Sequence, residues 1–115
     1  MTDSTAPTPE PVWVVLCTAP PDRAEHLAEA LVQERVAACV NVLPGVRSFY
    51  HWQGKLERDD EQLLVIKTQP RLWSRLKETV RRLHPYEVPE LIALPVAAVS
   101  GDYLHWLEDT LCSSD

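Results

Sequence analysis

The order in which strand-like and helix-like segments alternate most constrains the fold of this chain. Residues 12–18 are apolar, rich in valine and too short for a helix, which indicates a buried strand. Apolar residues then recur at helical spacing from Ala24 to about Arg35. Asp22 and Glu25 are three residues apart, as in a capping box, and predict the start of this first helix.

A long hairpin is expected next. Residues 37–52 are rich in β-branched and aromatic side chains, and Pro44-Gly45 predicts a bulge or bend within this strand. Gln53-Gly54 is typical of a tight turn, after which residues 55–68 return as the partner strand. The acidic middle of the returning segment, residues 57–61, is expected to be exposed and irregular.

The second half repeats the alternation. Pro70 opens a second amphipathic helix that must stop near His84, residues 91–99 read as a fourth strand, and Ser100 caps a short final helix. The order β-α-β-β-α-β plus a terminal helix predicts an α+β fold of the ferredoxin-like, split βαβ type. Right-handed crossovers place both main helices on one face of an antiparallel sheet.

The expected strands also predict an assembly. The first and fourth strands carry apolar residues on both of their faces. In a sheet with one face exposed to water, apolar and polar residues should alternate along each strand. We therefore expect a homo-oligomer whose subunits bury their open sheet faces against one another. If Val40 and Val42 face the helices, Cys39 points toward the subunit interface.

Composition excludes several classes of protein. The 115 residues fit one domain, placed at residues 12–112, and residues 1–11 lack signal-peptide features and read as a mobile, disordered polar leader. A cytoplasmic location is expected. No apolar run is long enough to span a membrane, and the net charge of −6 without a basic stripe argues against nucleic-acid binding.

Three cysteines are the first candidates for chemistry. Cys17, Cys39 and Cys112 are odd in number and widely spaced, so neither a disulfide framework nor a structural zinc site is expected. A thiolate at Cys39 or Cys17 suits copper or another soft ion. The alternative for each is a small buried apolar residue, and it is the stronger for Cys17, which lies in an apolar central strand. No role is assigned to Cys112.

The segment from His84 to Glu90 holds an imidazole, a phenol and two carboxylates between prolines. His84 could ligate a metal ion, with Glu87 or Glu90 supplying oxygen. The alternative is that His84 stabilises the C-terminus of a helix, while Tyr86 and Glu90 hold the loop against a neighbouring subunit by hydrogen bonds.

Several motifs resemble one family in the same order. They are LCTAP (16–20), ERVAACVNVLPGVRSFYHWQGK (34–55), LLVIKT (63–68), HPYEVPEL (84–91) and DYLHWL (102–107). Across residues 12–111 the chain resembles the CutA family of divalent-cation tolerance proteins. The resemblance implies a homotrimer of ferredoxin-like subunits similar to P-II-type signalling proteins, a role in tolerance of copper and other divalent ions, and a cysteine at the position of Cys39.

Two functions from different classes follow. The first is a non-enzymatic homotrimer that binds copper or another divalent metal ion. The runner-up is a P-II-like regulatory module that binds a small anionic effector in a cleft between subunits, with Trp52, Lys55, Lys67 and Tyr86 as cleft residues. Alternatively, Trp52 packs the hairpin turn and the lysines pair with nearby acids. An enzyme is least favoured because the sequence shows neither a nucleophile with a paired base nor a phosphate loop.

Overall fold

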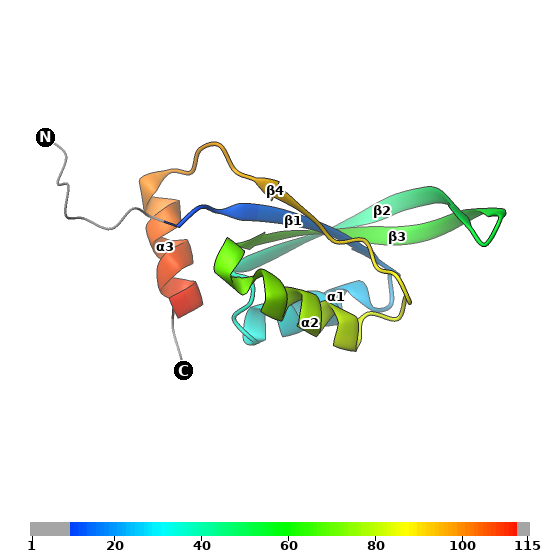
Figure 1. The fold of residues 1–115 in the computed structure, drawn as a ribbon, viewed down its shortest axis with the longest axis horizontal. Coiled ribbons are helices and arrows are strands. Elements are labelled where there is room, and N and C mark those ends of the chain that lie inside the picture. Colours follow the sequence, from blue (N-terminus) through cyan, green and yellow to red (C-terminus); the bar gives the residue numbers. More distant parts are fainter. Residues whose placement is uncertain (1–9, 113–115) are drawn as a thin grey trace, which may run out of the picture.

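The computed structural model describes residues 10–112, which form one antiparallel sheet with helices on one face (Figure 1). The strands are β1 (Trp13–Ala19), β2 (Cys39–Trp52), β3 (Lys55–Thr68) and β4 (Ile92–Pro95), in the spatial order β2-β3-β1-β4. This order confirms the predicted ferredoxin-like topology.

Most of the predicted leader, residues 1–9, lies outside the described residues. Within the described part, the Glu10 carboxylate accepts hydrogen bonds from the backbone N–H and the guanidinium of Arg71, both at 2.9 Å.

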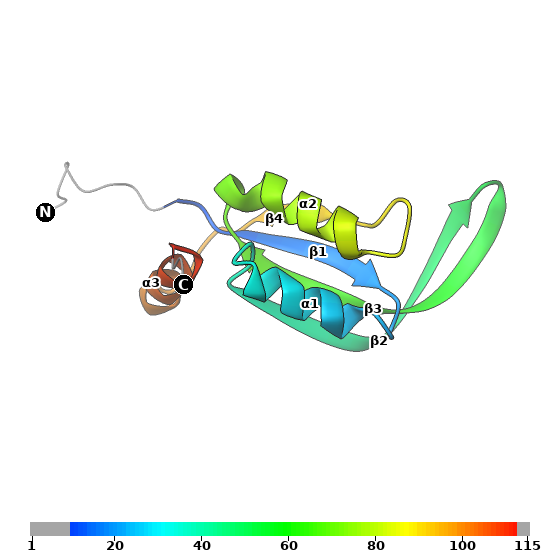
Figure 2. The ribbon, with the colours of Figure 1, turned by 90° about the horizontal axis from the view of Figure 1, so that it is seen from below.

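The helices are α1 (Ala24–Gln33), α2 (Trp73–Leu83) and α3 (Gly101–Cys112), and a 3₁₀ turn at Pro70–Leu72 precedes α2. Helices α1 and α2 lie side by side on the same face of the sheet, as the crossover rule predicts (Figure 2). No helix in the described part of the chain has the length and apolar character to cross a bilayer.

The predicted capping box at the start of α1 is wrong. Arg23 is the N-cap residue, and its side chain makes no capping hydrogen bond. The carbonyl oxygen of Pro20 instead accepts hydrogen bonds from the N–H groups of Arg23 and Ala24, at 2.9 and 3.0 Å. This turn places Asp22 one residue too early to cap the helix.

The core lies between the sheet and the two helices. Val15 and Cys17 of β1 and Leu64 and Ile66 of β3 are fully buried, opposite Leu27, Leu31, Leu76 and Val80 of the helices. Full burial of each large aliphatic side chain contributes about 1.5–3 kcal/mol, so this layer is the main hydrophobic contribution to the subunit fold.

The opposite face of the sheet, called the open face below, is apolar and uncovered. The register aligns Val14 and Leu16 of β1 with Leu94 and Ile92 of β4 on this face. Leu94 and Ile92 are 46% and 50% exposed. Helix α3 packs at the end of the sheet through Leu107 and Leu111, in a separate cluster with Val12, Ala38 and Leu72.

The hairpin extends beyond the sheet as a two-stranded arm (Figure 1). The predicted bulge is confirmed, since the register shifts between Leu43 and Val46. The predicted turn is confirmed as well, with positive φ angles of 51° at Gln53 and 80° at Gly54.

Two expectations about strands need correction. The acidic segment 57–61 is regular strand paired with β2, and Glu61 is only 4% exposed. An arm of two strands exposes both faces, so its residues need no apolar alternation to form a ladder. The fourth strand is Ile92–Pro95 instead of 91–99, because Pro95 lacks an N–H and the chain then turns toward α3.

Candidate functional site

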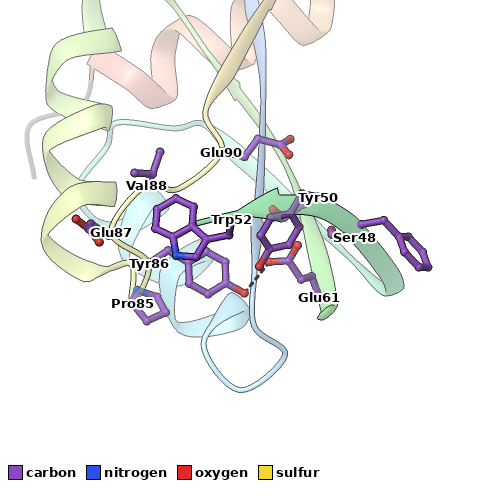
Figure 3. A pocket seen from close by; sticks show the side chains of 11 residues that line it. Ser48, Tyr50, Trp52, Glu61, Pro85, Tyr86, Glu87, Val88 and Glu90 are labelled. Atoms are coloured by element: carbon purple, nitrogen blue, oxygen red, sulfur yellow. Dashed lines mark hydrogen bonds between the residues drawn. The ribbon is translucent and has the colours of Figure 1, made fainter. Parts of the chain in front are cut away.

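A hollow of about 740 Å³ lies between the hairpin arm and the loop that follows α2 (Figure 3). Its lining comes from the end of β1, from both strands of the arm and from the loop. The lining residues are Thr18, Ser48, Phe49, Tyr50, Trp52, Glu61, Pro85, Tyr86, Glu87, Val88 and Glu90. The predicted loop residues Tyr86, Glu87 and Glu90 thus share this hollow with Trp52 of the arm.

His84 is fixed where α2 ends. Its backbone is extended (φ −79°, ψ 136°), as expected for a residue before proline, and its ring is buried. The Tyr86 N–H donates to His84 Nδ1 at 3.1 Å, so Nδ1 is the unprotonated nitrogen of a neutral ring. Nε2 therefore carries the proton and donates to the carbonyl oxygen of Thr18 at 2.8 Å. Both ring nitrogens are engaged in this conformation.

Tyr86 holds the loop against the arm of the same subunit. Its hydroxyl donates to Glu61 Oε2 at 2.8 Å, the bond drawn in Figure 3. Burial, followed by the hydrogen bond to Glu61, raises the pKa of the Tyr86 phenol well above its usual value. A second phenol, Tyr50, donates to Asp59, and this bond raises the pKa of Tyr50 to about 12. Both phenols are therefore neutral at physiological pH.

Cys17 lies on the helix-covered face of β1 and is fully buried. Its thiol donates to the Thr18 carbonyl oxygen, with 3.7 Å between Sγ and O. Burial, with smaller contributions from the carboxylates of Glu90 and Glu61, raises the pKa of this thiol to about 12. Cys17 and His84, which are far apart in the sequence, therefore meet at one carbonyl oxygen.

Cys39 occupies a different place. Val40 packs against the helix-covered core, so Cys39 lies on the open face, beside Lys67 in the register. Burial and the neighbouring Cys39 thiol raise the pKa of Tyr103 on α3. Cys39 thus belongs to the α3 end of the sheet, whereas Cys17 lies near the loop at the other end (Figure 1). Within one subunit, the two thiols do not form one site.

The predicted cleft residues separate into two groups. Trp52 and Tyr86 both line the hollow. Lys55 lies at the hairpin tip, opposite Trp52 in the ladder, and Lys67 donates to Asn41 at the far end of β3. A strand rises about 3.3 Å per residue, so Lys55 and Lys67 are about 40 Å apart along β3.

Several lining residues were not predicted from the sequence, and two of them, Glu61 and Thr18, accept the hydrogen bonds that hold this region together. The Glu61 carboxylate accepts a hydrogen bond from the Tyr86 hydroxyl. The backbone carbonyl of Thr18 accepts hydrogen bonds from the Cys17 thiol and the His84 ring. The one sequence signal for Glu61 is its position where the acidic run meets the apolar segment 63–66. A backbone carbonyl leaves no sequence signal at all.

Among residues 10–112, no group of three or more His, Cys, Asp or Glu side chains is placed to hold a metal ion. All three cysteines are free thiols. Any metal ion held here would thus have few side-chain ligands within one subunit.

The chain is similar to known proteins along almost its whole described length. Residues 13–110 match the family model described as "CutA1 divalent ion tolerance protein". The divalent-cation tolerance protein CutA of Thermus thermophilus is 50% identical over 97 residues, which cover 84% of this chain and 94% of that protein.

Solved structures agree with this match. The crystal structure of CutA1 from Oryza sativa superposes with a TM-score of 0.87 at 42% identity, over 94% of this chain and 100% of that one. The PII-like protein CutA from Nostoc sp. PCC 7120, in its apo form, superposes with a TM-score of 0.80 at 34% identity, over 86% of this chain and 96% of that one.

Proposed function

Because the chain belongs to the CutA1 family of divalent ion tolerance proteins, we propose that it is a homotrimeric, non-enzymatic protein that binds copper. The predicted family and the predicted fold are both confirmed by the matches above. Copper as the ion and the trimer as the assembly are our proposals.

The copper proposal rests on one observation: the Cys17 thiol and the His84 ring both hydrogen-bond to the carbonyl oxygen of Thr18. Sγ and Nε2 lie 3.7 and 2.8 Å from the same atom, so both side chains point toward one small region. A thiolate with an imidazole is a donor pair that suits copper(I). A structural zinc ion would need four ligands, which favours copper over zinc at this pair.

Both donors carry a proton in the described conformation. The Cys17 thiol has a pKa raised to about 12, and His84 Nε2 donates to Thr18. A metal ion held by Cys17 and His84 must release the Cys17 proton, so its affinity should rise with pH. Binding at Nε2 also requires the ring proton to move to Nδ1, which gives up the hydrogen bond from the Tyr86 N–H. Glu61 and Glu90 contribute to the raised pKa of Cys17, so they lie close enough to favour a cation at this thiol.

The open face supports the homotrimer. Leu43, Ile92 and Leu94 are between 44% and 50% exposed in the subunit. A contiguous apolar face of this kind marks an interaction surface. The face continues across β1 through Val14 and Leu16, which gives self-association a broad surface.

We also propose that the protein works in the cytoplasm. All three of its cysteines are free, which suits a reducing compartment. Fractionation of the source cells with a specific antibody tests this, and recovery of the protein outside the cytoplasm would contradict it.

A copper(I) titration under anaerobic conditions, against a chromogenic competitor, tests the site. Wild type should bind saturably and release protons, whereas Cys17→Ser and His84→Gln should each weaken binding at least about 10-fold. Cys112→Ser and His105→Gln are matched controls, because both side chains are exposed and distant from Thr18.

Cys39→Ser distinguishes the two thiol positions. If Cys39→Ser abolishes binding while Cys17→Ser leaves it intact, copper binds on the open face. If none of the variants changes binding, the copper proposal fails.

A further inference from the structure

The chemistry of the hollow is that of a cation site. Three of its lining residues, Glu61, Glu87 and Glu90, are carboxylates, and four are aromatic. Of the described residues that line it, none is lysine, arginine or histidine. Such a lining repels phosphates and carboxylates, so this hollow does not favour the anionic effector of the runner-up hypothesis.

Two of the four aromatic rings, Tyr86 and Tyr50, are held in place by hydrogen bonds, and their phenols stay neutral. Tyr86 is fixed by its hydroxyl bond to Glu61, and Tyr50 by its bond to Asp59. In Figure 3, Trp52 and Tyr86 point from two different elements into the same space. Trp52 is 40% exposed, so part of its ring can still be covered by a ligand. Preorganised ring faces attract cations through their quadrupoles.

The size and lining of the hollow fit a small organic molecule better than a bare metal ion. A hollow of about 740 Å³ falls within the range of small-molecule sites. No group of three metal-ligating side chains occurs among the described residues. Aromatic rings and Val88 offer no ligands to an inorganic cation, but they do pack against methylene and methyl groups.

We infer that the hollow between the arm and the HPYEVPE loop binds a small organic ammonium ion. Glu87 and Glu90 on the loop and Glu61 on β3 neutralise its charge, while Trp52 and Tyr86 cover its aliphatic part. This inference does not rest on the copper proposal, because Cys17 and His84 do not line the hollow.

Calorimetric titration of the full-length assembled protein with tetramethylammonium and with spermidine tests the inference. Tetramethylammonium tests the contribution of the aromatic rings to binding, and spermidine adds the contribution of several carboxylates. Both titrations are run at matched ionic strength, with magnesium as the reference for general attraction to a chain of net charge −6. We expect saturable binding of one or both organic ions that magnesium does not reproduce.

Variants assign the binding to the hollow. Trp52→Leu should weaken tetramethylammonium about 10-fold. Glu87→Gln and Glu90→Gln should each weaken spermidine about 3-fold to 10-fold, increasingly at low salt. Matched controls are Trp106→Leu, an exposed tryptophan on α3, and Glu25→Gln, an exposed carboxylate on α1. Both should bind as wild type does.

Three results overturn the inference. They are no binding of either organic ion beyond the magnesium reference, unchanged binding in the three hollow variants, and equal weakening in the two controls. If Trp52→Leu fails to fold, Glu90→Gln decides alone, because this exposed loop side chain can change without disturbing the core. Copper binding at Cys17 and His84 can persist in every one of these cases.

Discussion

The two faces of the sheet are built from the same kinds of residue but have different surroundings. On the helix-covered face, Val15 and Leu64 are fully buried within one subunit. On the open face, Ile92 and Leu94 remain about half exposed. The helix-covered face gives the subunit a core of its own, so the apolar residues of the open face fit the proposed contact with other copies of the chain.

The largest expected effect comes from placing a charge on the open face. Leu94→Glu would bury an unpaired carboxylate at each subunit contact, which costs several kcal/mol per site. We expect the protein to change from trimer to folded monomer at micromolar concentration, measured by sedimentation velocity with circular dichroism. Val32→Glu, at an exposed apolar position on α1, is the matched control and should remain trimeric.

A trimer that persists in Leu94→Glu would mean that β4 lies outside the interface. Unfolding of the Leu94→Glu subunit would contradict the idea that the helix-covered face alone supports the fold. Either result would contradict the hypothesis that one face of the sheet supports folding and the other supports assembly.

Neighbouring leucines on β3 allow a closer comparison of the two faces. Leu64 is fully buried against the helices, whereas Leu63 points to the open face and is half-buried. In the monomeric Leu94→Glu background, Leu64→Ala should lower the free energy of unfolding by about 4 kcal/mol because it leaves a cavity. Leu63→Ala should cost about 1 kcal/mol or less there, since its surroundings are already open to water.

Urea denaturation of both variants measures this difference. Equal losses would show that the open face contributes to the subunit core and would weaken the comparison. In the trimeric background, we expect Leu63→Ala to act on assembly, seen as a concentration-dependent unfolding midpoint.

Local patterns predicted most of this fold. The element order, the bulge at Pro44-Gly45 and the turn at Gln53-Gly54 follow from residue types whose backbone preferences act within a few positions. The regular acidic strand in the arm was missed. Its pairing with β2 is set by the hairpin turn and not by burial.

The candidate site was harder to predict because its geometry is tertiary. Cys17 and His84 were both candidates, but only the packing of α2 against β1 brings them to one carbonyl oxygen. Lys67 was grouped with Trp52, although counting along the predicted hairpin already places Lys67 far from the turn. The sequence thus supplied the chemical groups, while the register and helix packing decided which of them meet.

The last comparison concerns the Cys17 thiol, which is buried on the helix-covered face. Burial raises the pKa of Cys17 from 9.0 to about 12, so the folded state binds this proton more tightly than the unfolded state. Its stabilising contribution is complete below pH 9 and declines as the pH rises toward 12. Between pH 8 and pH 11, the resulting loss in the free energy of unfolding amounts to about 3 kcal/mol. Urea denaturation across this range should therefore show a shallower alkaline loss of stability for Cys17→Ala than for wild type. Parallel slopes for Cys17→Ala and wild type would show that the Cys17 thiol is not held neutral by its burial.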